Sequence, residues 1–202
     1  MSKYKLTYFD FSGSRGEDCR LALFLSGVDF EDNRLVGGAW KDLKPTTPYG
    51  ALPILECEGK PMLAQSNVIL AYVGREYGLH PKDNWEAARH EAVMASVEEL
   101  RIAMGPSGKI TDEAEKKKAR EEFAAGYLQD WGRNVSAQIR GPFVGGEELS
   151  VADVKVANML QTFERGVLDY IPKDVLSSFP KLTTLKETFD SHPKVKEWRA
   201  RH

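Results

Sequence analysis

Hydrophobic and polar positions change their spacing along the chain, and the change divides it near residue 80. In the first part, short apolar runs alternate with runs that have helical spacing. These predict strands at 5–9, 30–35, 52–57 and 61–64, and helices at 15–26, around 40–44 and at 66–77. Gly27 and Gly78 follow two of the helical runs, as is typical of helix C-termini. Glu58-Gly59 predicts a hairpin turn, and Ser66 is expected to cap the last helix.

From Trp85 onward, the apolar positions have helical spacing only. Helices are predicted at 85–103, from 111 to about 139 and from 151 through 163, with further starts at Pro172, Pro180 and Pro193. Ser150 and Asp153 match a capping box, and the helix that they open is expected to lie in the middle of this part. The fold class is therefore α/β plus all-α. We predict a thioredoxin-like βαβαββα domain at 1–79, a linker at 80–84 and a helical-bundle domain at 85–202.

Composition and charge exclude several classes of protein. With 202 residues, 42% of them apolar, the chain is long enough for one large domain or two small ones with real cores. A net charge of −2 gives no electrostatic reason to expect nucleic acid or an anionic membrane as partner. The start of the chain lacks an apolar signal core, and no apolar run approaches the roughly 18 residues of a membrane helix. Cys19 and Cys57 form no CxxC motif, so a reduced, cytoplasmic setting fits best.

Several residues of the first part suit the binding of a small peptide. Trp40 and Lys44 share a face if helical and offer an indole N–H and an ammonium. Leu52-Pro53 offers backbone groups, and Gln65-Ser66 offers an amide and a hydroxyl at a helix N-terminus, where carboxylates are favoured. Each motif also has a purely structural interpretation: packing beside a solvated charge, a trans proline on an edge strand, and a helix cap. Tyr8, at the end of the first strand, could likewise be a core aromatic.

Taken in order, these motifs resemble those of the cytosolic glutathione S-transferases. They are Tyr8 after a strand, Arg15-Gly16-Glu17 opening a helix, Trp40-x-x-x-Lys44, Pro48-Tyr49-Gly50, Leu52-Pro53-Ile54-Leu55, Gln65-Ser66 and the box from Ser150 to Asp153. The stretch Leu6-Thr7-Tyr8-Phe9 is similar to the sigma class, which includes glutathione-dependent prostaglandin D synthase. The resemblance covers nearly the whole chain. Its motifs are modest singly but specific in this order and spacing.

The resemblance implies a glutathione site in the thioredoxin-like domain. Trp40 and Lys44 would bind the glycyl carboxylate, and Gln65-Ser66 would hold the γ-glutamyl end. The Leu52-Pro53 bond would be cis, and the backbone of Leu52 would pair with the cysteinyl residue like an added strand. The resemblance also implies a homodimer, in which Glu99 stands where the family usually has an aspartate that reaches glutathione in the partner subunit.

Tyr8 carries the implied chemistry. Its hydroxyl would donate a hydrogen bond to the glutathione sulfur and hold it as a thiolate, with Arg15 adding positive charge nearby. Lowering a thiol pKa by two units from about 8.5 takes roughly 2.7 kcal/mol. A hydrogen bond to a charged group contributes about 1.5–3 kcal/mol, which is comparable to this requirement. The thiolate would then attack a small hydrophobic electrophile in a detoxification reaction, with glutathione as co-substrate.

Departures from the family pattern concern the electrophile pocket. Tyr8 and Arg15 are seven positions apart, one more than is usual in the sigma class, so the loop 10–14 is expected to carry an extra residue. Pro106 lies in a segment where prostaglandin synthases carry an aromatic residue of the pocket. Lys155 stands in place of another pocket aromatic. These changes argue against prostaglandin isomerisation as the main activity. The predicted lining residues of the pocket are Phe11, Pro106, Lys155 and Met159.

Other functions are open on the same residues. The fold also serves as a non-catalytic protein, such as a lens crystallin, or as a carrier of hydrophobic ligands, although the presence of Tyr8 and Arg15 speaks against this. A disulfide reductase would need a cysteine or serine where Tyr8 stands. No metal is expected, because the four histidines show no ligand spacing; they are His80, His90, His192 and His202.

Overall fold

A computed structural model describes residues 3–201 and divides them into two compact units. One unit comprises residues 3–82 together with 191–201, and the other comprises residues 83–190. Each unit is described by itself. Among the described residues, no helix is both long and apolar enough to cross a membrane.

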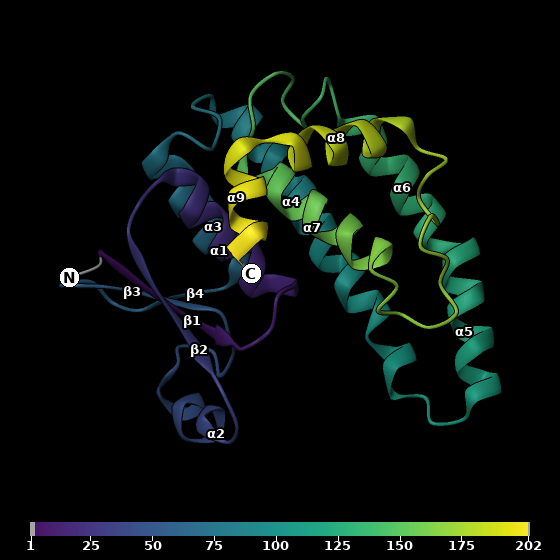
Figure 1. The fold of residues 1–202 in the computed structure, drawn as a ribbon, viewed down its shortest axis with the longest axis horizontal. Coiled ribbons are helices and arrows are strands. Elements are labelled where there is room, and N and C mark those ends of the chain that lie inside the picture. Colours follow the sequence, from purple (N-terminus) through teal and green to yellow (C-terminus); the bar gives the residue numbers. More distant parts are fainter. Residues whose placement is uncertain (1–2, 202) are drawn as a thin grey trace. The chain divides into compact units, whose positions relative to one another are not determined.

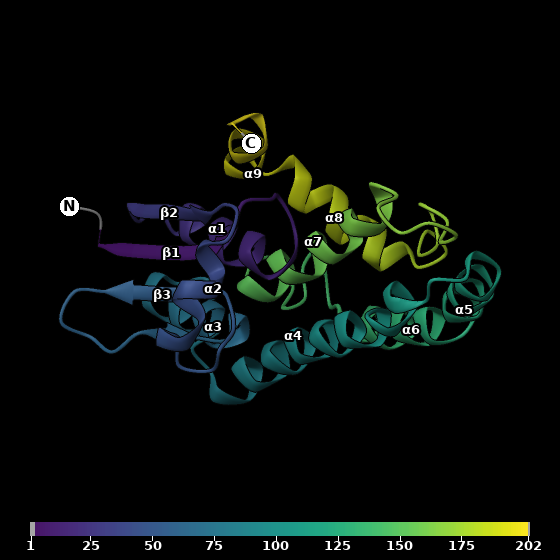
Figure 2. The ribbon, with the colours of Figure 1, turned by 90° about the horizontal axis from the view of Figure 1, so that it is seen from below.

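The first unit is built on a four-stranded sheet with strand order β2-β1-β3-β4. The strands are β1 (Tyr4–Phe9), β2 (Phe30–Leu35), β3 (Ile54–Cys57) and β4 (Leu63–Ala64). β1 is parallel to β2 and antiparallel to β3, and β3 is antiparallel to β4. The helices are α1 (Ser14–Ser26), α2 (Ala39–Leu43), the 3-10 turn η1 (Lys44–Thr46), α3 (Ser66–Tyr77) and α9 (Pro193–Arg201). Figure 2 shows β2, β1 and β3 side by side, and the thioredoxin-like βαβαββα order is confirmed.

Helices α1 and α3 pack against each other and against the sheet, while α2 lies apart from both (Figure 1). Both packed helices end as predicted, at Gly27 and Gly78, which adopt left-handed φ angles of 74° and 77°. The predicted capping role of Ser66 is wrong. Gln65 occupies the N-cap position and Ser66 is the first helical residue of α3, because the chain turns into the helix at Gln65.

The last helix, α9, groups with the first unit, whereas the sequence alone placed it in a helical domain spanning 85–202. Trp198 Nε1 donates to Glu17 Oε1 of α1 at 2.6 Å. Lys194 Nζ donates to the carbonyl of Leu25 at 3.0 Å. These contacts join residues about 170 positions or more apart in sequence, so local sequence patterns could not predict them.

The second unit consists of helices. They are α4 (Asn84–Met104), the 3-10 turn η2 (Pro106–Lys109), α5 (Glu113–Ala125), α6 (Tyr127–Gln138), α7 (Val151–Glu164) and α8 (Pro180–Ser191). Helix α7 is its centre, since 11 of its 14 residues are buried, and it packs against α4. The predicted central position of this helix within the helical part is confirmed.

Two predictions for this unit are wrong. The single helix expected from 111 to about 139 is broken at Gly126, whose φ of −104° and ψ of −96° are not helical. Glycine loses the most backbone freedom in a helix, so a break there is favoured. Pro172 does not open a helix, because turns run from 173 to 178, and Val175 N and Ser177 N bond to carbonyls three residues back.

The predicted capping box at the start of α7 is present. The Asp153 carboxylate accepts from the backbone N–H groups of Val144 at 2.7 Å and Ser150 at 2.8 Å, and from the Ser150 hydroxyl at 2.6 Å. Burial nevertheless raises the pKa of Asp153 from 3.8 to about 6, against the opposite effect of these hydrogen bonds.

This shift predicts a pH-dependent stability. Between about pH 4 and pH 6, the folded protein keeps a proton on Asp153 that the unfolded chain releases. The contribution of this group to stability is therefore complete below about pH 4 and is lost as the pH rises through about 6. Urea unfolding of wild type and Asp153→Asn should show a free-energy difference that falls over this range. Parallel pH curves for the two proteins would contradict the assignment.

Candidate active site

The sheet topology brings most of the predicted ligand-binding residues to one end of the first unit. Thr7 pairs with Ile54, and Ile54 pairs with Ala64. Tyr8 follows Thr7 in β1, Gln65 follows Ala64 at the end of β4, and Pro53 directly precedes Ile54 of the antiparallel β3, so these three lie at the same edge of the sheet. β2 ends at this edge too, because it runs parallel to β1, and leads into α2.

Tyr8 lies at the end of β1 with only 5% of its surface exposed. Its ring packs between two phenylalanines, with centroid distances of 5.4 Å to Phe9 and 5.5 Å to Phe11. Phe11 is 46% exposed, so one side of this aromatic cluster remains open to solvent. The ring of Tyr8 is therefore held in place by its neighbours and cannot swing freely.

Gly16 provides the space that the Tyr8 ring occupies. A Cβ atom at this position would lie 2.0 Å from Cδ1 and 2.3 Å from Cγ of Tyr8. The backbone of α1 therefore packs directly on the ring. The sequence predicted that Arg15-Gly16-Glu17 opens a helix. It did not predict that the missing side chain of Gly16 leaves room for the Tyr8 ring.

Arg20 was missed in the sequence and is a central support of the site. It is fully buried (0% exposed), and its guanidinium lies 5.7 Å from the centroid of the Tyr8 ring. Its Nη1 and Nη2 donate to the carbonyls of Phe11 and Phe9 at 2.9 and 3.0 Å, and its Nε donates to Asp32 at 2.8 Å. Arg20 thus fixes the chain on both sides of Asp10. The available signal was a lone arginine inside an otherwise apolar helical run.

The loop between β1 and α1 turns sharply just before Arg15. Gly13 has a φ of 144° and Ser14 a φ of 56°. A positive φ is uncommon for a residue other than glycine. Gly13 is the N-cap of α1 and Ser14 is its first residue, and both fall in the stretch 10–14, where the sequence predicted an extra residue. Arg15 follows in the first turn of α1, as predicted.

Trp40 and Lys44 are placed by α2 and the turn that follows it. Trp40 is half-buried and its ring meets that of Phe9 edge-on, at a centroid distance of 5.9 Å. Lys44 is exposed, its backbone N–H bonds to the carbonyl of Trp40, and its stem passes close to Gly50. The two residues thus keep helical spacing, as predicted.

The remaining residues of this edge are Leu52, Pro53, Gln65 and Ser66. The Leu52-Pro53 peptide bond is cis, as the family resemblance implied. Gln65 is exposed and has a φ of 73°, an unusual value for its residue type. Backbone outliers of this kind cluster at functional sites and ligand clamps. Ser66 is buried at the first turn of α3.

The other predicted residues belong to the second unit. Glu99 is exposed on α4, and Pro106 is exposed at the start of η2. Lys155 and Met159 are buried in α7, and the Lys155 ammonium contacts Glu98. Glu98, which also accepts from Arg101 at 3.0 Å, was not predicted, because its partner Lys155 lies 57 residues away in the sequence.

Within residues 3–201, no group of three or more His, Cys, Asp or Glu side chains is arranged to hold a metal ion. His80, His90 and His192 are among the residues searched, and His202 lies outside them. Of the charged residues around Tyr8, Arg20 is already engaged with two carbonyls and Asp32. The phenol of Tyr8 thus lies at the same edge of the sheet as Pro53 and Gln65.

Comparisons with known proteins cover both units. The family profile described as "Glutathione S-transferase, N-terminal domain" matches residues 4–75, and the profile for the C-terminal domain matches residues 102–202. Glutathione S-transferase 1 of Ascaris suum is 32% identical over 99% of this chain and 97% of its own. Hematopoietic prostaglandin D synthase of Gallus gallus is 29% identical over 98% and 96%. The crystal structure of the glutathione S-transferase from Ascaris lumbricoides is 33% identical, with a TM-score of 0.84 over 98% and 97%.

Proposed function

The chain belongs to the glutathione S-transferase family, and from that premise we propose that Tyr8 activates glutathione as a thiolate for conjugation to small hydrophobic electrophiles. The observation that carries this proposal is the way in which the Tyr8 ring is packed. Its ring is buried between Phe9, Phe11 and Gly16 at the edge of the sheet where the other proposed glutathione ligands converge. A phenol held in this way can donate a directed hydrogen bond to a bound sulfur.

Glutathione would lie along the edge defined by Tyr8, Pro53 and Gln65. Trp40 and Lys44 would donate to the glycyl carboxylate. The backbone of Leu52 would pair with the cysteinyl residue, and Gln65-Ser66 would hold the γ-glutamyl end. Ser66 opens α3, a helix of 12 residues, and the first turn of a helix favours a bound carboxylate.

Thiolate formation would depend on Tyr8 with support from Arg15. A hydrogen bond to a charged group contributes about 1.5–3 kcal/mol, enough to lower a thiol pKa by one to two units. Arg15, in the first turn of α1, adds positive charge next to Gly16, on which the Tyr8 ring packs. The thiolate sulfur then attacks the electrophile and forms the new carbon–sulfur bond, and the leaving group departs with its electron pair.

The electrophile would meet the open side of the aromatic cluster around Tyr8. Phe11 is its exposed member. Pro106, a candidate from the sequence, is exposed on the helical unit. Lys155 and Met159, the other candidates from the sequence, are buried in α7, where they contribute to the packing of the helical unit.

We also propose a sigma-class homodimer that acts in the cytoplasm, with Glu99 reaching glutathione in the partner subunit. Members of this family typically form dimers. Glu99 is exposed on α4, and Tyr49 and Val68 are exposed apolar side chains of the glutathione-binding unit, which a partner subunit could cover.

Tyr8→Phe tests the assigned chemistry. We expect the variant to bind glutathione like the wild type but to conjugate a chloronitrobenzene about 10- to 100-fold more slowly, because it loses one charge-assisted hydrogen bond. Glutathione binding is measured by calorimetry, and the pKa of the bound thiol by the ultraviolet absorbance of the thiolate.

Tyr127→Phe is the matched control, because Tyr127 is an exposed tyrosine of α6. If Tyr8→Phe conjugates at the wild-type rate, the proposed role of Tyr8 is wrong, and a hydroxyl of the loop, on Ser12 or Ser14, becomes the candidate. If the wild type binds glutathione but turns over no electrophile, a carrier or crystallin-like role replaces the enzymatic one.

A further inference from the structure

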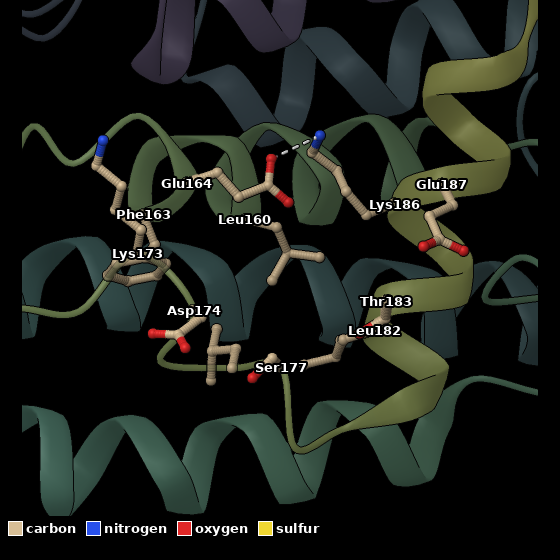
Figure 3. A pocket seen from close by; sticks show the side chains of 11 residues that line it. Leu160, Phe163, Glu164, Lys173, Asp174, Ser177, Leu182, Thr183, Lys186 and Glu187 are labelled. Carbon is tan, nitrogen blue, oxygen red and sulfur yellow. Dashed lines mark ion pairs between the residues drawn. The ribbon is translucent and has the colours of Figure 1, made fainter.

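A cavity of about 390 Å³ lies within the helical unit and is lined by residues that the proposed function does not use. Its floor is apolar (Figure 3). Leu160 and Phe163 come from α7, Leu182 from α8 and Leu176 from the turns between them, and all four are buried. Small-molecule sites have volumes of about 300–1,000 Å³ and mostly apolar linings. The size and floor of the cavity fit a small ligand.

The turn segment 173–178 forms one wall, and α6 holds it in place. Gln129 Nε2 donates to the carbonyl of Val175 at 3.0 Å. A Cβ atom on Gly132 would lie 2.9 Å from Leu176, so the backbone of α6 touches this wall directly. The cavity is therefore preformed, and ordering its wall on ligand binding would cost little free energy.

The charged residues around the floor leave an excess of negative charge. The Lys186 side chain is only 7% exposed, and its ammonium pairs with Glu164 at 2.8 Å and with Asp190 (Figure 3). Its charge is thus matched by two carboxylates. Asp174 and Glu187 lie on opposite sides of the floor, and both are exposed. Neither makes an ion pair with any residue in the described range 3–201.

Lys173 is the remaining basic residue of the lining. Its stem lies against Gly166, where a Cβ atom would be 2.5 Å from Lys173 Cε. The charged lining residues are thus three carboxylates, on Glu164, Asp174 and Glu187, against the two ammonium groups of Lys173 and Lys186. An anionic ligand would meet this excess of like charge, whereas a cation would reduce it.

We propose that this cavity binds a small organic cation with an apolar body, such as an aryl-alkylammonium. The apolar body lies on the leucine floor, and the ammonium group lies beside Asp174 or Glu187. This site is separate in its residues from those proposed for glutathione and the electrophile, so the proposal does not depend on the proposed function.

Three probes that share one ring system test the charge preference. They are 2-(1-naphthyl)ethylamine, 2-(1-naphthyl)ethanol and 1-naphthylacetate, each titrated into the full-length protein by calorimetry. We expect the amine to bind about fivefold more tightly than the alcohol, the carboxylate to bind most weakly, and the preference to shrink in high salt. The double variant Asp174→Asn with Glu187→Gln should remove the preference for the amine. An amine that binds no more tightly than the alcohol, or a preference that survives in the double variant, overturns the proposal.

Thr183→Trp and Thr184→Trp locate the binding. Thr183 lines the cavity and is exposed, so an indole there can fill the space without entering the core; Thr184 is its exposed neighbour outside the lining. We expect Thr183→Trp to weaken amine binding about tenfold or more, and Thr184→Trp to leave it unchanged. Both variants should conjugate the chloronitrobenzene at the wild-type rate, which excludes binding in the electrophile pocket. Amine binding that is equal in both variants would overturn the proposal.

Discussion

Gly16→Ala is expected to slow glutathione conjugation at least as much as Tyr8→Phe, by about 10- to 100-fold or more. The added methyl would lie 2.0 Å from Cδ1, 2.3 Å from Cγ and 2.7 Å from Cε1 of Tyr8. These are atoms of a rigid ring that Phe9 and Phe11 confine, so the ring or the start of α1 must move. A hydroxyl displaced by about 1 Å no longer reaches the sulfur with good geometry.

The same substitution should also lower stability, because overpacking a core costs about 1–3 kcal/mol. The conjugation rate, the pKa of the bound thiol and the urea midpoint are the measurements. Gly38→Ala is the matched control, because a Cβ there meets nothing within 4 Å and its φ is −80°. A Gly16→Ala variant that keeps the wild-type rate and thiol pKa would show that the close packing of Gly16 on the Tyr8 ring has no role in catalysis.

Glu98→Ala is expected to lower the free energy of unfolding by about 3 kcal/mol, the lower end of what breaking a buried ion pair costs. The Lys155 side chain is fully buried, whereas that of Glu98 is 20% exposed. Removing the carboxylate takes this counter-charge away from a fully buried ammonium, so less of the cost of desolvating the ammonium is offset. Urea unfolding with two spectroscopic probes measures the effect and tests whether the transition is two-state.

Glu99→Ala supplies the neighbouring control, since Glu99 is exposed and its loss should change stability by less than about 0.5 kcal/mol. The double variant Glu98→Gln with Lys155→Met removes both charges and should recover most of the lost stability. Equal stabilities of Glu98→Ala and Glu99→Ala would contradict the assigned importance of the pair. Conjugation by the double variant would also report whether the charge of Lys155 matters to the electrophile.

Signals that act over a few residues were recognised in the sequence. The glycines after α1 and α3 end those helices, and the Ser150–Asp153 box begins α7, because each satisfies backbone groups of its own helix end. The same local reasoning failed at Gly126 and Pro172. A glycine in a long charged run and a proline before a short segment are compatible with more than one backbone path, and packing decided between the paths.

The order and spacing of the motifs determined by themselves the thioredoxin-like unit, the helical remainder and the set of residues proposed to bind glutathione. The tertiary structure alone decided how these residues are supported. Gly16 makes room for the Tyr8 ring, Arg20 fixes the carbonyls of Phe9 and Phe11, and Glu98 meets Lys155 from a position 57 residues away. The physical reason is the range of the interactions. Caps and periodicity act along the chain within one or two turns, whereas close packing and buried charge pairing act between surfaces that only the folded chain brings together.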